Sequence, residues 1–146
     1  VGSAAAPPVE EQVQRPAPTA ARGRVLVAED DEVSLYSTRK LLEKAGYEVT
    51  VARSGQEAVE LHEREEFDLI LMDVQMPVMD GIEATRRIRE TGPENRRDIP
   101  IIALTAYAMA GDRERFLASG MNGHIAKPVE FEALLRSAGE FLKKED

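Results

Sequence analysis

Five short runs of strand-forming residues recur along the chain, and a segment with helical spacing of its apolar positions follows each one. Strands are predicted at residues 24–28, 47–52, 67–73, 99–104 and 123–126. Helices are predicted at residues 32–45, from Ser54 onward, and at 82–90, 108–119 and 130–143. This alternation is typical of a doubly wound α/β domain, in which five helices flank a five-stranded parallel sheet. Right-handed crossovers then place the helices on both faces of the sheet.

The third predicted strand ends abruptly on a carboxylate. The apolar run 69–72 is followed by Asp73, and the chain then breaks at Pro77 and Gly81. Ligands and chemistry collect at the carboxyl edge of an open α/β sheet. Polar residues also follow three other predicted strands, namely Glu29, Asp30, Thr105 and Lys127. We therefore expect all five side chains to lie at one edge of the sheet.

Composition sets the size and class of the domain. A chain of 146 residues with 42% hydrophobic and 32% charged residues is typical of one globular domain. Residues 1–22 are rich in Ala and Pro and are predicted to form a disordered linker or a tag remnant, so the domain is expected at 23–146. The absence of cysteine excludes a disulfide framework, thiol catalysis and Cys-bound metals.

Charge and hydropathy disfavour two classes of partner. The net charge of −8 argues against a nucleic-acid surface, and Arg86, Arg87 and Arg89 are interpreted as a solvated helix face. His62, which lies among four glutamates, receives the same interpretation. No apolar run approaches the roughly 20 residues that span a bilayer. We expect a soluble, cytoplasmic domain without direct membrane contact. Any membrane anchor would belong to a longer parent protein.

The predicted cluster of carboxylates indicates a cation and a phosphoryl group. Two carboxylates 4 Å apart repel by about 4 kcal/mol at an effective dielectric constant near 20, so a cation must sit among Glu29, Asp30 and Asp73. Oxygen ligands without His or Cys select Mg²⁺, with Mn²⁺ as an alternative. Lys127 adds a second positive charge, and aspartate is a known nucleophile toward phosphorus. Asp73 is therefore the predicted phosphorylated residue. Asp31 either caps the first helix or joins the metal site.

Four segments together carry a family resemblance. Residues 25–31, 71–81, 103–106 and 125–128 resemble the receiver domain of two-component response regulators, which has a flavodoxin-like fold. The resemblance runs from Arg24 to about Leu142 and implies that Asp73 accepts a phosphoryl group from a histidine kinase or a histidine phosphotransfer domain. It also implies that Asp30, Asp73 and the carbonyl of Gln75 bind Mg²⁺ directly, with Glu29 acting through water.

The resemblance assigns further roles around Asp73. Lys127 would contact the phosphoryl oxygens, and the peptide bond before Pro128 would be cis. Thr105 would move toward the phosphoryl group and His124 would swing inward behind it, repacking the face that binds a downstream effector. His124 stands where the family usually has Tyr or Phe, so inward burial is expected to depend on pH. Gln75 and Tyr107 would tune the lifetime of the phosphoryl group.

The wider context leaves alternatives open. Residues 106–113 and 119–123 are similar to receivers fused to hybrid sensor histidine kinases, with a stand-alone single-domain regulator as the alternative. A Mg²⁺-dependent phosphohydrolase with an aspartyl-phosphate intermediate is a weaker alternative, because Gln75 occupies the place of its general acid. A flavin or nucleotide module would need a glycine-rich phosphate loop, which the sequence lacks. A receiver-like domain that is never phosphorylated is the last alternative.

Overall fold

The computed structural model describes residues 23–106 and 110–142, so the predicted linker and Tyr107 lie outside the described residues. Strands and helices alternate as follows: β2 (Arg24–Ala28), α1 (Glu32–Lys44), β3 (Glu48–Ala52), α2 (Gly55–Arg64), β4 (Leu69–Asp73), α3 (Gly81–Thr91), a 3₁₀ turn (Glu94–Arg96), β5 (Ile101–Thr105), α4 (Asp112–Ser119), β6 (Gly123–Ala126) and α5 (Phe131–Leu142). The predicted α/β fold is confirmed. Most bounds agree within two residues, although α4 begins four residues later than predicted.

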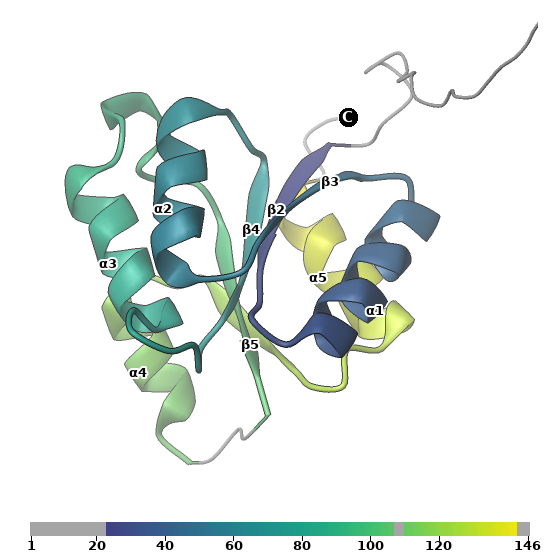
Figure 1. Ribbon diagram of the computed structural model, residues 1–146. Coiled ribbons are helices and arrows are strands. Elements are labelled where there is room, and N and C mark those ends of the chain that lie inside the picture. Colours follow the sequence, from purple (N-terminus) through teal and green to yellow (C-terminus); the bar gives the residue numbers. More distant parts are fainter. Residues whose placement is uncertain (1–22, 107–109, 143–146) are drawn as a thin grey trace, which may run out of the picture.

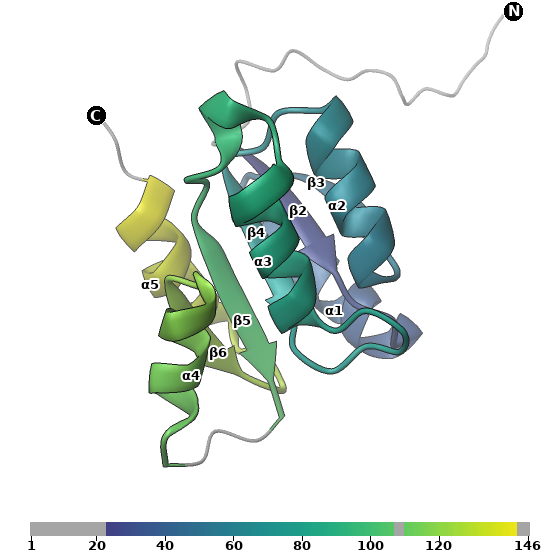
Figure 2. The same cartoon turned by 90° about the vertical axis from the view of Figure 1, so that its left-hand side faces the viewer.

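The sheet is parallel throughout and has the strand order β3-β2-β4-β5-β6. Helices α1 and α5 cover one face, and α2, α3 and α4 cover the other (Figure 1). Figure 2 shows this second layer of three helices in front of the sheet. The order places β4 at the centre, so the end of β4 has strand ends on either side. No helix in the described ranges is long and apolar enough to cross a membrane.

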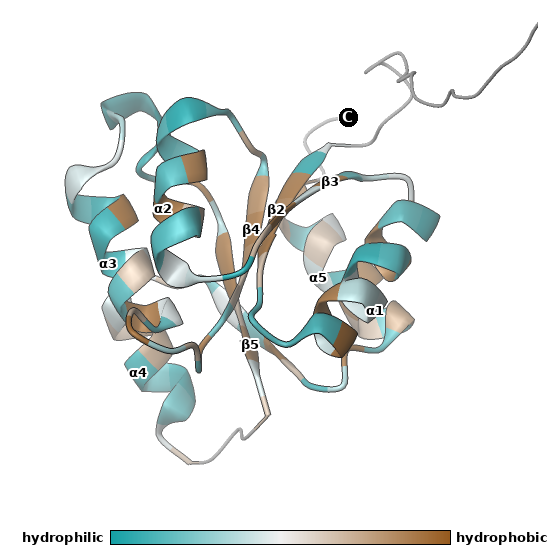
Figure 3. Cartoon of the chain, viewed as in Figure 1, coloured by the Kyte–Doolittle hydropathy of each residue, from teal (hydrophilic) through white to brown (hydrophobic). Residues whose placement is uncertain are grey.

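Alternate side chains of the central strands enter two separate cores. On β4, Ile70 and Met72 pack in the cluster beneath α2, α3 and α4, whereas Leu69 and Leu71 pack in the cluster beneath α1 and α5. All five residues of β4 and of β5 are buried. Such continuous burial is expected of parallel strands covered on both faces. Figure 3 shows the result, with hydrophobic strands inside and hydrophilic outer helix faces.

Side-chain caps fix where three helices begin. Asp31, Ser54 and Asp80 each accept a hydrogen bond from the backbone N–H three residues later, at 2.8, 3.0 and 2.9 Å. Such caps satisfy N–H groups that have no partner within the helix. Of the two roles left open for Asp31, the structure therefore shows the cap of α1.

The prediction that Arg89 belongs to a solvated face is wrong. Its guanidinium is partly buried and donates to the carbonyl of Gly120 at 2.7 and 2.9 Å and to the carbonyl of Ile99 at 2.7 Å. It also donates to Asn122 Oδ1, which accepts the backbone N–H of Ile101. Arg89 lies one turn after the buried Thr85, at the margin of the apolar stripe. Arg86 and Arg87 are exposed as expected and pair with Glu83.

The prediction for His62 is also wrong. The ring is fully buried between α2 and the 3₁₀ turn, and its Nε2 lies 2.9 Å from the carbonyl oxygen of Arg96. A carbonyl oxygen only accepts, so Nε2 carries the proton, and Nδ1 is buried without a hydrogen-bond partner. The flanking glutamates suggested an exposed face, but His62 lies one turn after the buried Ala58 and follows it into the interior.

Burial makes His62 a source of pH-dependent stability. Desolvation lowers its pKa below the ordinary value of 6.5, although the bond to Arg96 opposes this shift. Below about pH 6.5 the unfolded chain binds a proton that the folded chain does not, so the free energy of unfolding falls. We expect wild type to lose about 1 kcal/mol more than His62→Gln between pH 7.5 and 5.5 in urea denaturation.

The second histidine of the chain provides the control for this measurement. His124→Gln makes the same substitution at the other histidine, on β6, and serves as the matched control. Glutamine at position 62 keeps an N–H donor for the Arg96 carbonyl. Equal pH dependence in wild type and His62→Gln would contradict the prediction.

Candidate functional site

The carboxyl ends of four strands bring the predicted site residues together. Asp73 and Thr105 are the last residues of β4 and β5, whereas Glu29 and Lys127 directly follow β2 and β6. Because β4 lies between β2 and β5, Asp73 has a neighbouring strand end on each side. The parallel ladder thus gathers residues that are up to 98 positions apart in the sequence.

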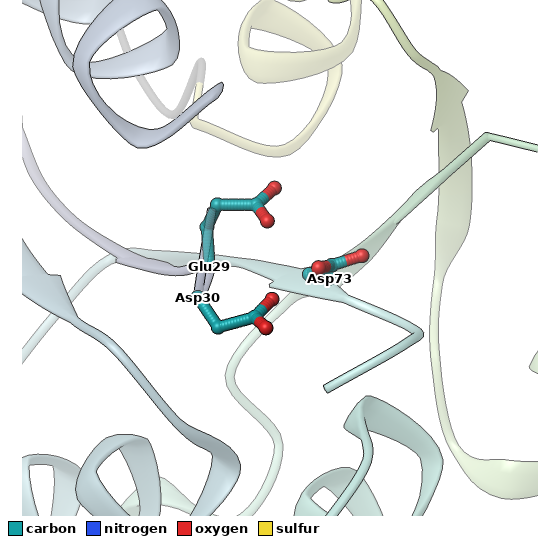
Figure 4. A group of neighbouring side chains, drawn as sticks. All are labelled: Glu29, Asp30 and Asp73. Atoms are coloured by element: carbon teal, nitrogen blue, oxygen red, sulfur yellow. The ribbon is translucent and has the colours of Figure 1, made fainter. Parts of the chain in front are cut away.

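Three carboxylates converge at this edge. One oxygen from each of Glu29, Asp30 and Asp73 lies within 4.8 Å of the others. Figure 4 shows Glu29 and Asp30 projecting from the segment after β2, and Asp73 beside them on the neighbouring strand. Glu29 and Asp73 are only 1% and 3% exposed, whereas Asp30 is exposed. Two acids therefore form the floor of the cluster, and the third faces solvent.

Lys127 neutralises the buried side of the cluster. Its Nζ lies 2.8 Å from Glu29 Oε1 and 3.3 Å from Asp73 Oδ1. Burial alone would lower the pKa of Lys127, but the two carboxylates outweigh burial and raise the pKa. The next peptide bond, to Pro128, is cis. Lys127 is therefore a fixed positive charge within the floor of the site.

Asp73 is held close to its point of ionisation. Burial raises the pKa of Asp73 to about 7, and the neighbouring Glu29 raises it in the same direction. Lys127 and the backbone N–H of Gln75, which lies 3.3 Å from Asp73 Oδ1, oppose this shift. The charge of Lys127 thus does not offset the burial of Asp73 and the charge of Glu29. A further positive charge at the open side would complete the ionisation of Asp73.

The donor set fits Mg²⁺. The cluster offers three carboxylates without His or Cys, one of them exposed, so water and a ligand have room to complete the coordination. Mg²⁺ prefers oxygen ligands and binds through one or two carboxylates together with water and substrate phosphate. Gln75, which is exposed two residues after Asp73, lies beside the same cluster.

The loop after Asp73 is shaped by close backbone contacts. Gly81 N donates to the carbonyl of Val74 at 3.0 Å, and a Cβ on Gly81 would lie 2.2 Å from the carbonyl oxygen of Asp73. Val78 has φ of 68°, and Met79 N donates across it to the carbonyl of Pro77 at 2.7 Å. This γ-turn leaves the Val78 side chain fully exposed. The loop packs tightly at its end and is open at its tip.

Thr105 and His124 lie on the same face of the sheet. Thr105 follows Ile101 and Ala103, which pack beneath α4, at a spacing of two residues. His124 pairs in register with Ala103, so it shares that face. Its ring centroid lies 6.0 Å from that of Phe116 on α4. Thr105 is buried and His124 is half-buried. Tyr107, the remaining predicted residue, lies outside the described ranges.

Comparison with known proteins identifies the family. Residues 25–138 match the model of the response regulator receiver domain. The chain belongs to this family. It is 42% identical over 111 residues to hybrid signal transduction histidine kinase I of Dictyostelium discoideum, covering 73% of this chain but only 6% of that protein. It is 39% identical over 118 residues to the polar-differentiation response regulator DivK of Brucella ovis, covering 81% of this chain and 94% of that protein.

Solved receiver structures are similar in fold. The receiver domain of a sensor histidine kinase from Pseudomonas aeruginosa, described with a magnesium ion coordinated in the active site cleft, is 43% identical with a TM-score of 0.75, covering 82% of this chain and 97% of that one. The receiver domain of a Saccharomyces cerevisiae response regulator, crystallised with a histidine phosphotransfer signaling protein, matches at 32% identity and a TM-score of 0.73, covering 82% and 88%.

Two features at this edge were missed in the sequence. Arg53 directly follows β3, so the fifth strand also ends beside the cluster, and its guanidinium pairs with Glu32 at the start of α1. Val33 and Tyr36 on α1 are 77% and 58% exposed. The rule applied to the other four strand ends would have found Arg53. Exposure of the two apolar residues becomes visible only once α1 is packed on the sheet.

The raised pKa of Asp73 predicts that removing its charge stabilises the fold. The folded pKa of about 7 exceeds the ordinary value of 3.8, so stability contributed by this group is complete below pH 3.8 and is lost as the pH rises through 7. We expect Asp73→Asn to raise the free energy of unfolding by about 1–3 kcal/mol at pH 8 without divalent cations, and by less at pH 5. Urea denaturation measures both values.

An exposed aspartate provides the matched control. Asp98→Asn removes the same charge from the loop before β5 and should change stability by no more than about 0.5 kcal/mol. A loss of stability in Asp73→Asn at pH 8 would mean that the ion pair with Lys127 outweighs burial and repulsion.

Proposed function

We propose that this receiver domain is the phosphoacceptor of a two-component phosphorelay, with Asp73 as the residue that is phosphorylated. The observation that carries the proposal is the position of the Asp73 carboxylate, which lies 3.3 Å from the partly buried Lys127 and beside two further acids. A structural carboxylate needs one partner. Asp73 has a pKa of about 7 and lies between the Lys127 ammonium and two other carboxylates. This arrangement suits a carboxylate that accepts a dianionic phosphoryl group.

The proposed chemistry is a direct transfer from a phosphohistidine. A carboxylate oxygen of Asp73 attacks phosphorus, the P–N bond to the donor imidazole breaks, and its electron pair returns to the imidazole nitrogen. Lys127 offsets the charge on the transferred phosphoryl oxygens, because its ammonium already lies between Glu29 and Asp73. Positioning and charge stabilisation account for most of the catalysis in such transfers.

Mg²⁺ is the proposed cofactor, and Mn²⁺ would substitute through the same preference for oxygen. Asp30, Asp73 and the backbone carbonyl of Gln75 would hold the ion, with Glu29 acting through water. A bound ion supplies positive charge that favours the ionised form of Asp73 and offsets phosphoryl charge. Support comes from the donor set and from the Pseudomonas relative described with magnesium in its cleft.

The proposed response to phosphorylation passes through Thr105 and His124. Both lie on the face of the sheet that α4 covers, and His124 borders Phe116 of that helix. Movement of Thr105 toward the phosphoryl group would open space into which the imidazole turns. The face formed by α4, β6 and α5 would then present a different surface to a downstream effector. Gln75 and Tyr107 are the proposed determinants of phosphoryl lifetime.

The parent protein is proposed to be a hybrid sensor histidine kinase, with a stand-alone regulator as the alternative. The sequence identity to the Dictyostelium kinase supports the hybrid arrangement, and the similar identity to DivK supports the stand-alone regulator. In either case the phosphoryl donor is a histidine kinase or a histidine phosphotransfer domain, and the receiver would work in the cytoplasm, where these donors act.

Exposed apolar side chains border the acid cluster and support a protein donor. Val33 and Tyr36 lie on the first two turns of α1, which begins three residues after Glu29. Val78 projects from the loop after Asp73. Arg39 and Lys40 each lie 5.8 Å from the centre of the Tyr36 ring, so the aromatic ring has cations on its flanks. This rim suits a folded donor whose phosphohistidine inserts into the cluster.

Covalent labelling tests the proposed phosphoacceptor. With Mg²⁺ and acetyl phosphate, we expect one phosphoryl group per wild-type chain by intact-protein mass spectrometry, lost on chelation of the metal. Asp73→Asn removes the nucleophile and should abolish labelling, whereas Asp98→Asn should label normally. Labelling of Asp73→Asn would contradict the proposal. Repeated turnover of a phosphomonoester by wild type would favour the phosphohydrolase alternative.

The choice of donor tests the proposed docking rim. We expect Tyr36→Ala to slow transfer from a phosphorylated histidine phosphotransfer domain about five- to tenfold, because truncating an aromatic anchor at an interface typically costs more than 1 kcal/mol. Labelling by acetyl phosphate, which needs no docking surface, should be unchanged. Leu117→Ala, an equally apolar change on the exposed side of α4, should affect neither rate. Equal slowing with both donors would contradict a docking role.

A further inference from the structure

Every strand of the sheet either ends in a polar residue or is directly followed by one at the phosphoacceptor edge, and the function proposed above uses only four of these strand ends. The fifth is Arg53, which follows β3. Because β3 is the neighbour of β2 in the sheet, Arg53 lies on the side of the acid pair that faces away from Asp73. Its side chain is 53% exposed. Because Arg53 lies on the far side of Glu29 and Asp30 from Asp73, we look for a role other than direct contact with the phosphoryl group.

Contacts from residues 52 and 53 bracket the turn that carries Asp30. Before Asp30, the backbone N–H of Glu29 donates to the carbonyl of Ala52 at 2.9 Å. After Asp30, the carboxylate of Glu32 pairs with the guanidinium of Arg53. Residues 29–32 are thus tied at one end to Ala52, the last residue of β3, and at the other end to Arg53, the residue after it.

Arg53 is itself anchored. Its backbone N–H donates to Glu57 Oε1 at 2.8 Å, and Glu57 N donates in turn to Ser54 Oγ at 3.0 Å. This pair of bonds is a variant of the capping box that begins α2. The guanidinium therefore extends from a backbone fixed to both β2 and α2, so it can act as a point of attachment for the start of α1.

Asp30 depends on this support more than its neighbours do. Glu29 and Asp73 are buried, and the ammonium of Lys127 contacts both carboxylates. Within residues 23–106 and 110–142, the exposed carboxylate of Asp30 makes neither a hydrogen bond nor an ion pair with another side chain. Its position is therefore set by the backbone of the turn, whose far end is fixed by the cap at Asp31 and by the pairing of Glu32 with Arg53.

We infer that Arg53 is a positioning residue, which holds the turn 29–32 through Glu32 so that Asp30 is placed to bind the divalent cation. The inference rests on the proposed Mg²⁺-dependent function. Arg53 does not touch the cation. It reduces the freedom that Asp30 must lose when the cation binds, and this preorganisation raises affinity without adding a ligand.

When Arg53 is replaced, the loss of positioning and the change in charge alter the affinity for the cation in opposite directions. Replacing Arg53 alone would leave the Glu32 carboxylate unneutralised, and the added negative charge would favour a cation. Loss of positioning would weaken cation binding. Replacing both residues keeps the local net charge the same, so the doubly neutral variant Glu32→Gln/Arg53→Gln isolates positioning. Arg53→Lys retains a charged partner for Glu32 and serves as the conservative variant.

The test is a Mg²⁺ titration of the full 146-residue chain, followed by calorimetry and by backbone amide shifts. Exposed ion pairs have modest energies, so we expect the doubly neutral variant to bind Mg²⁺ about two- to fivefold more weakly than wild type. Arg53→Lys should stay within about twofold of wild type. Glu83→Gln/Arg86→Gln removes another exposed ion pair, on α3, and should bind as wild type does.

Phosphorylation by acetyl phosphate supplies a second readout. In the doubly neutral variant, the Mg²⁺ concentration for half-maximal rate should rise by the same factor, and the rate at saturating Mg²⁺ should be retained. Wild-type Mg²⁺ affinity in the doubly neutral variant, or equal weakening in the Glu83/Arg86 control, would overturn the inference. Failure of wild type itself to bind Mg²⁺ or to be labelled at Asp73 would instead overturn the proposed function.

Discussion

The contact of one partly buried ammonium with two buried carboxylates is the constraint on which the rest of the site depends. Without Lys127, Glu29 and Asp73 would share a nearly solvent-free position as like charges, and folding would force at least one of them to stay protonated. With Lys127, their negative charge is largely but not fully offset. The remaining imbalance falls on Asp73, whose pKa is raised to about 7. The same imbalance makes the open side of the cluster attractive to a cation.

The sheet order converts this local balance into a property of the fold. The lysine reaches the carboxylates because β6 ends at the same edge as β2 and β4, with β5 between. The turn into α5 begins at the cis peptide bond before Pro128. Burial of β4 and β5 along their whole length keeps water away from the floor of the site. The apolar strands therefore influence the chemistry through the dielectric environment as well as through stability.

Much of this arrangement could be predicted from the sequence, because it follows from rules that act along one segment at a time. Apolar runs predict buried strands, and the polar residue after each run predicts the edge where it lies. That reasoning brought Glu29, Asp30, Asp73, Thr105 and Lys127 to one edge, and the structure places all five there. The cap at Ser54 followed equally from local spacing.

What could not be predicted depends on segments that meet only in the folded chain. His62 and Arg89 are polar residues at the margins of apolar stripes, and local composition placed both in solvent. Their burial depends on carbonyl groups of distant segments, at Arg96 for His62 and at Gly120 and Ile99 for Arg89. The sequence does not show which backbone carbonyl groups will lack a hydrogen-bond donor in the folded chain. The pairing of Arg53 with Glu32 could not be predicted for the same reason, although the strand-end rule places Arg53 itself at this edge.

The loop between Asp73 and Gly81 contains one position whose residue type is fixed by packing and another whose residue type can vary. Any side chain at position 81 would collide with the carbonyl of Asp73, so selection must keep glycine there for the chemistry to survive. Three residues earlier, the Val78 side chain is fully exposed, so a substitution there changes the surface rather than the core. Duplicated copies of such a domain could therefore diverge at the loop tip and acquire separate partners while inheriting the same catalytic floor. Few mutations would then be needed for two duplicated domains to bind different partners without cross-reaction.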